Sequence, residues 1–153
     1  MENRIAFVDD RGDLYTADAL GQDRRLVTPG LRGGLSQEPG RTRVSAANWP
    51  TWSPDGQSLA FSWVSRSAGR LMIRLLVADV ESGEVTPLYE NPPDVPPGIA
   101  PNLPHYIAWS PDSRRIAFLT MTAAGQTLFL APADGSGPVR SVATGAPFFP
   151  IWS

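Results

Sequence analysis

Two segments of the chain are near copies of each other: WSPDGQSLAF at residues 52–61 and WSPDSRRIAF at residues 109–118. In both, a tryptophan and a Ser-Pro-Asp turn precede a triplet made of an apolar residue, alanine and phenylalanine. Proline restricts φ to values that suit a turn, and an aspartate side chain can accept hydrogen bonds from the backbone amides that follow it. The pattern therefore predicts two short antiparallel strands joined by a tight turn.

The repeat extends beyond this hairpin and occurs three times, with its triplets beginning just after Arg4, Ser58 and Arg115. Each copy continues through a turn containing glycine into a second apolar run, and through another glycine turn into a short third run. Runs of about five residues between turns are typical of β-strands. No segment has the sustained i, i+3, i+4, i+7 spacing of an amphipathic helix. The sequence predicts an all-β fold.

A unit with a Trp strand, an Ala-Phe strand, a middle strand and an outer strand is organised like a propeller blade. The two quoted segments, each followed by a strand such as LLVADV (residues 75–80), resemble the WD-like repeat of TolB-like β-propellers. They also resemble the propeller domains of prolyl-oligopeptidase-type peptidases. The resemblance covers nearly the whole chain, although no Trp strand precedes the first copy. It implies a β-propeller but no particular activity, because propellers host many unrelated functions.

The predicted strands number three in the first copy, four in the second, four in the third and one in the final segment FPIWS. Together they would form three four-stranded antiparallel blades in a single unit, residues 1–153. The order is circularly offset, 3+4+4+1 strands, so that the last strand of the chain has the place of the first strand of a blade. The first blade takes its strands from residues 4–28 and an inner strand, residues 147–153, from a neighbouring chain; the second blade is residues 48–89 and the third is residues 105–144.

Three blades are too few to close a ring, since closed propellers have about four to eight. We therefore expect the ring to be completed by head-to-tail oligomerisation, which also covers the free sheet edges. Two chains are favoured, because they give the six blades usual in TolB-like proteins, whereas three chains would give nine. The alternative is that the chain is a piece of a longer propeller. The residues expected to close the ring are Pro150, Ile151 and Trp152 of one chain and Ile5, Ala6 and Phe7 of another.

The spacing at the proposed junction agrees with closure. Each internal Trp precedes its Phe by nine positions, at residues 52–61 and 109–118. Joining Ser153 of one chain to Met1 of the next places Trp152 eight positions before Phe7, one short of the internal spacing. Residues 147–153 are therefore expected to act as the inner strand of the next chain's first blade.

Composition excludes several classes of function. The net charge of −2 argues against a nucleic-acid partner or a membrane surface, both of which require a basic face. The chain has no cysteine and no lysine, which removes disulfides, thiolate chemistry and lysine-based catalysis. No apolar run approaches the ~20 residues that span a bilayer. The first residues do not have the pattern of a signal peptide. A cytoplasmic location is expected if the chain is complete, and a periplasmic or extracellular one if it was cut from a secreted precursor.

The sequence contains no clear motif for a catalytic or metal site. The single histidine, His105, would have to serve any Ser-His-Asp triad, and no Gly-x-Ser-x-Gly segment presents a nucleophile. Asp9, Asp10 and Asp13 lie close together, but they lack the regular ligand ladder of an EF-type calcium loop and fall where a hairpin turn is expected. Arg11-Gly12-Asp13 matches an integrin-binding tripeptide, and a match of three residues carries little weight. We expect no enzyme activity, no cofactor and no metal.

Binding is expected at the mouth of the central channel. Two long connections, residues 29–48 and 90–104, join outer strands to the next Trp strands, so both would lie on one face of the ring, where repeat proteins usually bind. The candidate ligand-binding residues are Arg41, Arg43, Trp49, His105 and Phe148. The predicted function is a non-enzymatic binding or scaffold module with a protein, peptide or small-ligand site. The alternative is an enzyme-associated propeller, such as the gating domain of a hydrolase or a small catalytic propeller.

Overall fold

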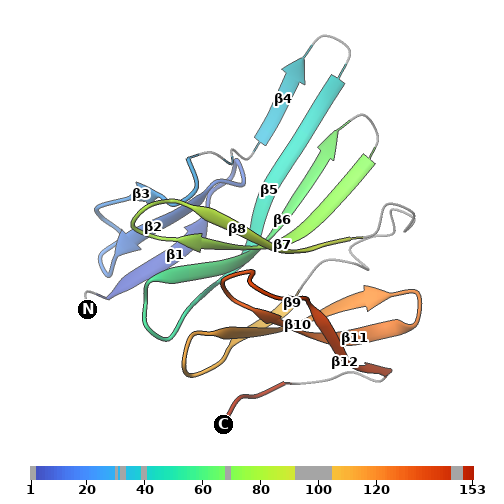
Figure 1. Ribbon diagram of the computed structural model, residues 1–153. Helices are drawn as coiled ribbons and strands as arrows, with labels where there is room; N and C mark the ends of the chain where they lie inside the picture. The colour runs from blue at the N-terminus through green and yellow to red at the C-terminus, as the bar shows by residue number, and fades with distance from the viewer. Residues whose placement is uncertain are drawn as a thin grey trace.

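The computed structural model describes residues 3–29, 31, 34–38, 41–67, 70–91, 105–145 and 150–153, and its strands form three antiparallel sheets (Figure 1). In chain order the strands are β1 (Arg4–Val8), β2 (Leu14–Asp18), β3 (Arg25–Leu26), β4 (Gly34–Glu38), β5 (Arg41–Trp52), β6 (Ser58–Ser67), β7 (Arg70–Asp79), β8 (Val85–Glu90), β9 (His105–Trp109), β10 (Arg115–Thr122), β11 (Gly125–Pro132) and β12 (Arg140–Gly145). The first sheet is β1-β2-β3, the second is β4-β5-β6-β7-β8 and the third is β12-β11-β10-β9; each sheet is called a blade below.

The predicted repeat of strands is confirmed in the second and third blades. The Trp strands β5 and β9 pair with the Ala-Phe strands β6 and β10, with Trp52 opposite Leu59 and Trp109 opposite Ile116. Each Ala-Phe strand then pairs with a middle strand, and each middle strand with an outer strand. The first blade has the last three of these strands in the same order, β1, β2 and β3.

Residues 29–48 are not the long connection that the sequence predicted. Residues 34–38 form β4, which pairs with β5 so that Leu35 lies opposite Val44, and this hairpin projects beyond the other strands in Figure 1. The physical reason is that β6 continues to Ser67 and offers a free backbone edge. The early part of β5 pairs along that edge, with Val44 opposite Arg66. Pairing of the neighbouring strand thus overrides the Gly-rich local sequence.

The Ser-Pro-Asp turn is held by the side chains that the sequence indicated. In the second blade Ser53 Oγ donates to Asp55 Oδ1 over 2.6 Å, and the same hydroxyl oxygen accepts from the Ser58 amide at 2.9 Å. The Gln57 amide donates to Asp55 Oδ1 over 3.0 Å. Donation from the Ser53 hydroxyl and then from the Gln57 amide lowers the pKa of Asp55. Gly56 has a φ of 71°, which a glycine adopts without steric cost.

The corresponding turn of the third blade repeats these bonds. Ser110 Oγ donates to Asp112 Oδ1 over 2.6 Å, and the Arg114 amide donates to the same oxygen over 3.1 Å. The two turns also touch, because the Asp55 amide donates to Ser113 Oγ over 3.2 Å. The repeated aspartates are therefore structural, and the turns help to hold neighbouring blades in register.

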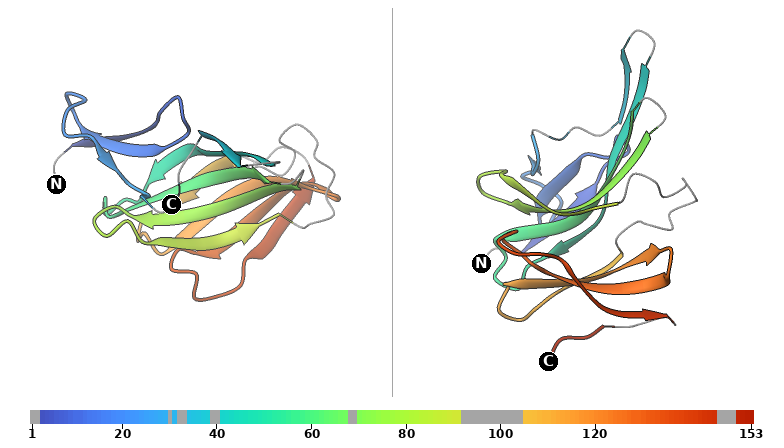
Figure 2. Two further views of the ribbon diagram at one scale, coloured as in Figure 1. Left: turned by 90° about the horizontal axis from the view of Figure 1, so that it is seen from above. Right: turned by 45° about the vertical axis from the view of Figure 1, so that its right-hand side comes forward.

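The core consists of two apolar layers, one on each side of the second blade, and Figure 2 shows the three sheets stacked face to face. Phe61 is fully buried in the layer between the first and second blades, and Phe118 is fully buried in the layer between the second and third. The predicted equivalence of these two residues is confirmed. Phe7 differs, since it is only half-buried, stacks on Tyr15 with ring centroids 5.8 Å apart and lies under the Arg24 guanidinium.

The turn between β1 and β2 fastens the first blade to the second. Gly12 has a φ of 84°, and a Cβ at this position would lie 2.6 Å from the Ala46 Cβ. The Gly12 carbonyl accepts a hydrogen bond of 2.9 Å from the Ala47 amide. Only glycine allows the two backbones to approach this closely.

Replacing Phe61 with alanine should lower the free energy of unfolding by roughly 3–5 kcal/mol, because a large buried ring is removed from between two sheets. Chemical denaturation of the two proteins measures the difference. Val142→Ala is the matched control, since its side chain is 55% exposed and the change should cost less than about 0.5 kcal/mol. A loss below about 1 kcal/mol for Phe61→Ala would contradict the packing described here.

Candidate ligand site on the inner strands

The two Trp strands each contain a bulge that points an aromatic residue outward. The pairing of β5 with β6 shifts between Asn48 and Thr51, and the pairing of β9 with β10 shifts in the same part of the blade. Trp49 has a φ of 50° and Tyr106 a φ of 48°. Each lies three positions before the Trp of its blade, so the two positions are equivalent. Bulges of this kind redirect side chains and are common beside functional sites.

These two side chains line one hollow. Trp49 is 53% exposed and Tyr106 is 58% exposed. The hollow has a volume of about 490 Å³, and its remaining lining residues are Pro50, Thr51 and Ile107. The indole Nε1 of Trp109 donates to the Thr51 carbonyl over 3.0 Å, which fixes β9 against β5 and sets the distance between the two walls. The lining is aromatic and largely apolar, so it suits stacking and apolar contact rather than acid–base chemistry.

Of the predicted ligand-binding residues, Trp49 lies in this hollow. His105 begins β9 directly before Tyr106, and only its backbone is described. Phe148 lies outside the described residues. Tyr106 was missed by the sequence reasoning, although its position three residues before Trp109, like that of Trp49 before Trp52, was a usable signal.

Arg41 and Arg43 lie on β5 and not in a loop, opposite Glu38 and Ser36 of β4. Since a strand rises about 3.3 Å per residue, they lie roughly 20–26 Å from Trp49 along β5. Their side chains are outside the described part of the structure. The backbone thus separates the predicted basic residues from the aromatic hollow.

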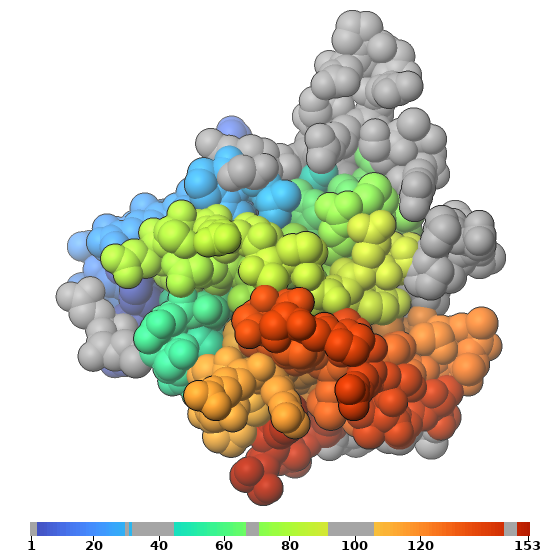
Figure 3. Space-filling model, viewed as in Figure 1, coloured from blue at the N-terminus to red at the C-terminus, as the bar shows by residue number. Residues whose placement is uncertain are grey.

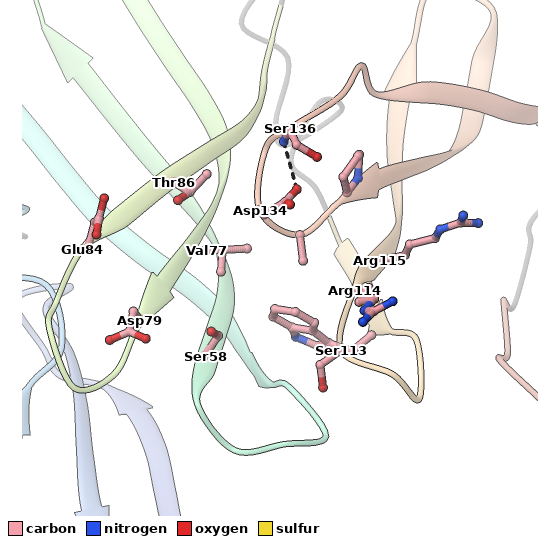
Figure 4. A pocket seen from close by; sticks show the side chains of 13 residues that line it. Ser58, Val77, Asp79, Glu84, Thr86, Ser113, Arg114, Arg115, Asp134 and Ser136 are labelled. Atoms are coloured by element: carbon pink, nitrogen blue, oxygen red, sulfur yellow. Dashed lines mark hydrogen bonds between the residues drawn. The ribbon is translucent and has the colours of Figure 1, made fainter.

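A second, polar groove of about 620 Å³ separates the second and third blades (Figure 4). Asp79 and Glu84 lie on the wall formed by the second blade, while Arg114 and Asp134 lie on that of the third. Asp79 Oδ1 already accepts bonds of 2.7 and 2.8 Å from the amide and hydroxyl of Ser82, which lower the pKa of the carboxyl group. A similar groove lies between the first and second blades. Both are seams between neighbouring blades, and Asp79, which lines both, is engaged in its own turn.

The acidic segment at residues 9–13 serves its own hairpin. Asp9 Oδ1 accepts bonds from the amides of Arg11 and Asp13 at 3.0 and 2.9 Å. Asp13 is only 4% exposed and Gly12 is pressed against β5, so the Arg-Gly-Asp tripeptide is not displayed. The described residues contain no group of three or more His, Asp or Glu placed to hold a metal ion. They also contain no helix long and apolar enough to cross a membrane.

The residues predicted to close a ring lie on the first and third blades. Ile5, Ala6 and Phe7 belong to β1, an edge strand of the first blade that pairs with β2. Residues 150–153, predicted as part of an inner strand, belong to none of the described strands, because no neighbouring strand edge pairs with them. They lie against the third blade, where the indole Nε1 of Trp152 donates to the Ala108 carbonyl over 3.0 Å.

Stacked antiparallel meanders with tryptophan-bearing inner strands are the blades of a β-propeller. The fold matches a solved structure described as "putative TolB from Agrobacterium tumefaciens", with a TM-score of 0.57 and 22% identity over 94% of this chain and 42% of that one. TolB from Acinetobacter baumannii is also similar, with a TM-score of 0.41 and 18% identity over 95% of this chain and 42% of that chain. The predicted TolB-like propeller fold is confirmed.

One curated protein is similar in sequence. Over 86 aligned residues, which cover 54% of this chain, the sequence is 38% identical to "Probable glutamyl endopeptidase, chloroplastic" of Oryza sativa subsp. japonica. The chain spans only 9% of the length of that protein. This similarity agrees with the predicted resemblance to propeller domains of peptidases. No protein-family model matches the chain.

Replacing Trp49 with asparagine should leave the free energy of unfolding unchanged or raise it by up to about 1 kcal/mol, because asparagine tolerates positive φ and the indole is half exposed. Denaturant titration measures the effect. The control is Ile107→Asn, which places an amide at a neighbouring position that is only 8% exposed and should cost at least about 2 kcal/mol. A loss above about 2 kcal/mol for Trp49→Asn would show that the fold needs this side chain.

Proposed function

We propose that this chain is a non-enzymatic binding module, a TolB-like propeller unit that binds a peptide or protein segment in the hollow between Trp49 and Tyr106. The observation that carries the proposal is that two large aromatic residues occupy equivalent bulged positions with positive φ and remain more than half exposed. A bulky residue in this conformation costs of order 1–3 kcal/mol. The strained backbone and the exposed rings support a role for both residues in ligand contact.

The lining defines the class of ligand. Aromatic walls with few charged groups recognise rings and the flat faces of proline, and extended proline-containing segments commonly dock on such surfaces. The inner strands of a propeller surround its central channel, so the hollow opens towards the axis. The proposed partner is therefore an extended peptide that carries proline or an aromatic side chain.

The proposed assembly is a ring of two chains arranged head to tail, with six blades in total. Its support lies at both ends of the row of sheets, where β1 is an edge strand and residues 150–153 carry the sequence of an inner strand. A ring with this symmetry displays the aromatic hollow twice around one axis.

The alternative function is that of a propeller associated with an enzyme, in which these blades belong to a longer chain and gate access to a hydrolase site. The 38% identity to part of a glutamyl endopeptidase favours it. The composition of this chain weighs against catalysis within it, because it has one histidine and no Gly-x-Ser-x-Gly segment. The binding proposal applies to the hollow in either case.

Binding can be tested by calorimetric titration with a short proline- and aromatic-rich peptide. Trp49→Asn should weaken the binding by about tenfold or more, as expected for a tryptophan at the centre of an interface. Arg114→Ala, in the polar groove between blades, is the matched control and should bind like the unmodified chain. Equal affinity of Trp49→Asn and the unmodified chain would rule out the hollow as the binding site.

Assembly can be tested by light scattering. The intact chain should have a mass of about 33 kDa, twice the 16.5 kDa of one chain, because two chains complete six blades. A chain lacking residues 148–153 should be a monomer, since its inner strand is removed. A folded intact monomer, or a truncated chain that keeps the mass of a ring, would contradict the proposed assembly.

A further inference from the structure

The same hydrogen bond joins the Trp segments of successive repeats at two places. The indole Nε1 of Trp109 donates to the carbonyl of Thr51, and that of Trp152 donates to the carbonyl of Ala108, both over 3.0 Å. Each acceptor is the residue just before the tryptophan of the preceding inner strand, because Thr51 precedes Trp52 and Ala108 precedes Trp109. The indoles of Trp109 and Trp152 therefore each bond one repeat back along the row of blades.

Trp52 departs from this pattern. Its Nε1 is buried and has no hydrogen-bond partner among the described residues, although its ring packs against the apolar layer between the first and second blades. A buried N–H without an acceptor is destabilising and rare in folded proteins. By the pattern of the other two indoles, its acceptor should belong to the inner strand of the first blade, a position that none of the described strands occupies.

The first blade also exposes an apolar face on the side turned away from the second blade. Ala6 and Val8 point towards the second blade and pack on its core, so Ile5 and Phe7 point the other way. Ile5 is 49% exposed and Phe7 is half-buried. The corresponding residues of the other two blades are fully buried against the preceding blade: Leu59, Phe61, Ile116 and Phe118. The first blade is therefore shaped to pack on a blade that precedes it.

The segment that could supply the missing inner strand lies at the opposite end of the row of blades. Residues 150–153 lie beyond the third blade, at the lower edge of the molecule in Figures 1 and 3, with Ile151 91% exposed. Their sequence Ile-Trp-Ser matches Thr-Trp-Ser at residues 51–53 and Ala-Trp-Ser at residues 108–110. Trp152 already makes the bond of an inner strand to the third blade. In the other repeats this sequence pairs with an Ala-Phe strand. β1 is an Ala-Phe strand, and one of its edges is unpaired among the described strands.

We infer that Trp52 Nε1 donates its hydrogen bond to the carbonyl of Ile151 of the partner subunit, a second copy of this chain whose residues 150–153 fill the inner position of the first blade. This inference rests on the proposed head-to-tail assembly and adds its register. In a two-chain ring the same bond forms at both junctions, since the junctions are related by symmetry. The bond makes Trp52 a residue that reports on, and contributes to, ring closure.

Nitrogen-15 NMR of the intact chain tests the bond directly. The five tryptophans give separate indole N–H resonances, and Trp52→Phe identifies the one that belongs to Trp52. On dilution, the Trp52 resonance should move upfield and lose protection from solvent exchange as the ring mass falls, because its acceptor leaves. The Trp109 resonance should stay in place, because its acceptor lies in the same chain. If the ring resists dilution, the chain lacking residues 148–153 supplies the monomer spectrum.

A matched pair of variants gives a second readout. Trp52→Phe should raise the dimer dissociation constant by about 25-fold, or about fivefold at each of two junctions that lose one hydrogen bond. It should do so without the loss of monomer stability that follows the removal of an intact bond. Trp109→Phe should destabilise the fold and leave the dissociation constant within about twofold, since it breaks a bond inside one chain.

The outcomes separate the inference from the assembly on which it rests. A stable ring in which the Trp52 resonance is the same in ring and monomer would overturn the inference and leave the assembly standing. A chain that is monomeric at all concentrations would overturn both. A concentration-dependent Trp52 resonance together with the selective effect of Trp52→Phe would establish the bond.

Discussion

The structure depends on the face-to-face packing of neighbouring sheets, which buries the large apolar side chains between them. Both apolar layers lie between blades and not inside any one of them, so no blade could bury its large side chains alone. Phe61 and Phe118 are fully buried because a preceding blade covers them, whereas Phe7 has the same place in its repeat and remains half-buried. Each apolar layer therefore needs two blades, and the packing of one sheet on the next is what buries the large side chains.

Local polar bonds fix the spacing that this packing requires. The Ser-Pro-Asp turns hold neighbouring hairpins in register through the bond from the Asp55 amide to Ser113. The indole of Trp109 ties β9 to β5, and the indole of Trp152 ties residues 150–153 to β9. Because the inner strands are held so firmly, their bulges can keep Trp49 and Tyr106 in an unfavourable backbone conformation. The candidate site is thus a product of the same contacts that build the core.

The same blades can serve a binding protein or a part of a larger enzyme. A propeller supplies a rigid ring, and its function lies in the residues displayed near the axis. In this chain the exposed aromatic residues Trp49 and Tyr106 lie on neighbouring inner strands and line one hollow. The charged groups of the described residues lie mainly in turns and in the seams between blades, where hydrogen bonds already engage several of them.

The sequence by itself determined the all-β class, the order of strands in each repeat, the role of Asp55 and Asp112 in turns and the equivalence of Phe61 and Phe118. These features are local or periodic, and the chemistry of turns and of alternating apolar residues specifies them. Only the tertiary structure decided that residues 34–38 form a strand, since the free edge of a long neighbouring strand overrides local preference. It also decided that Arg41 and Arg43 lie far along β5 from Trp49, and that Tyr106 joins Trp49 in one hollow. Such placements depend on which backbones pair and where a strand bulges. The equal spacing of Trp49 and Tyr106 before their tryptophans shows that the positions are equivalent, but not that both strands bulge there.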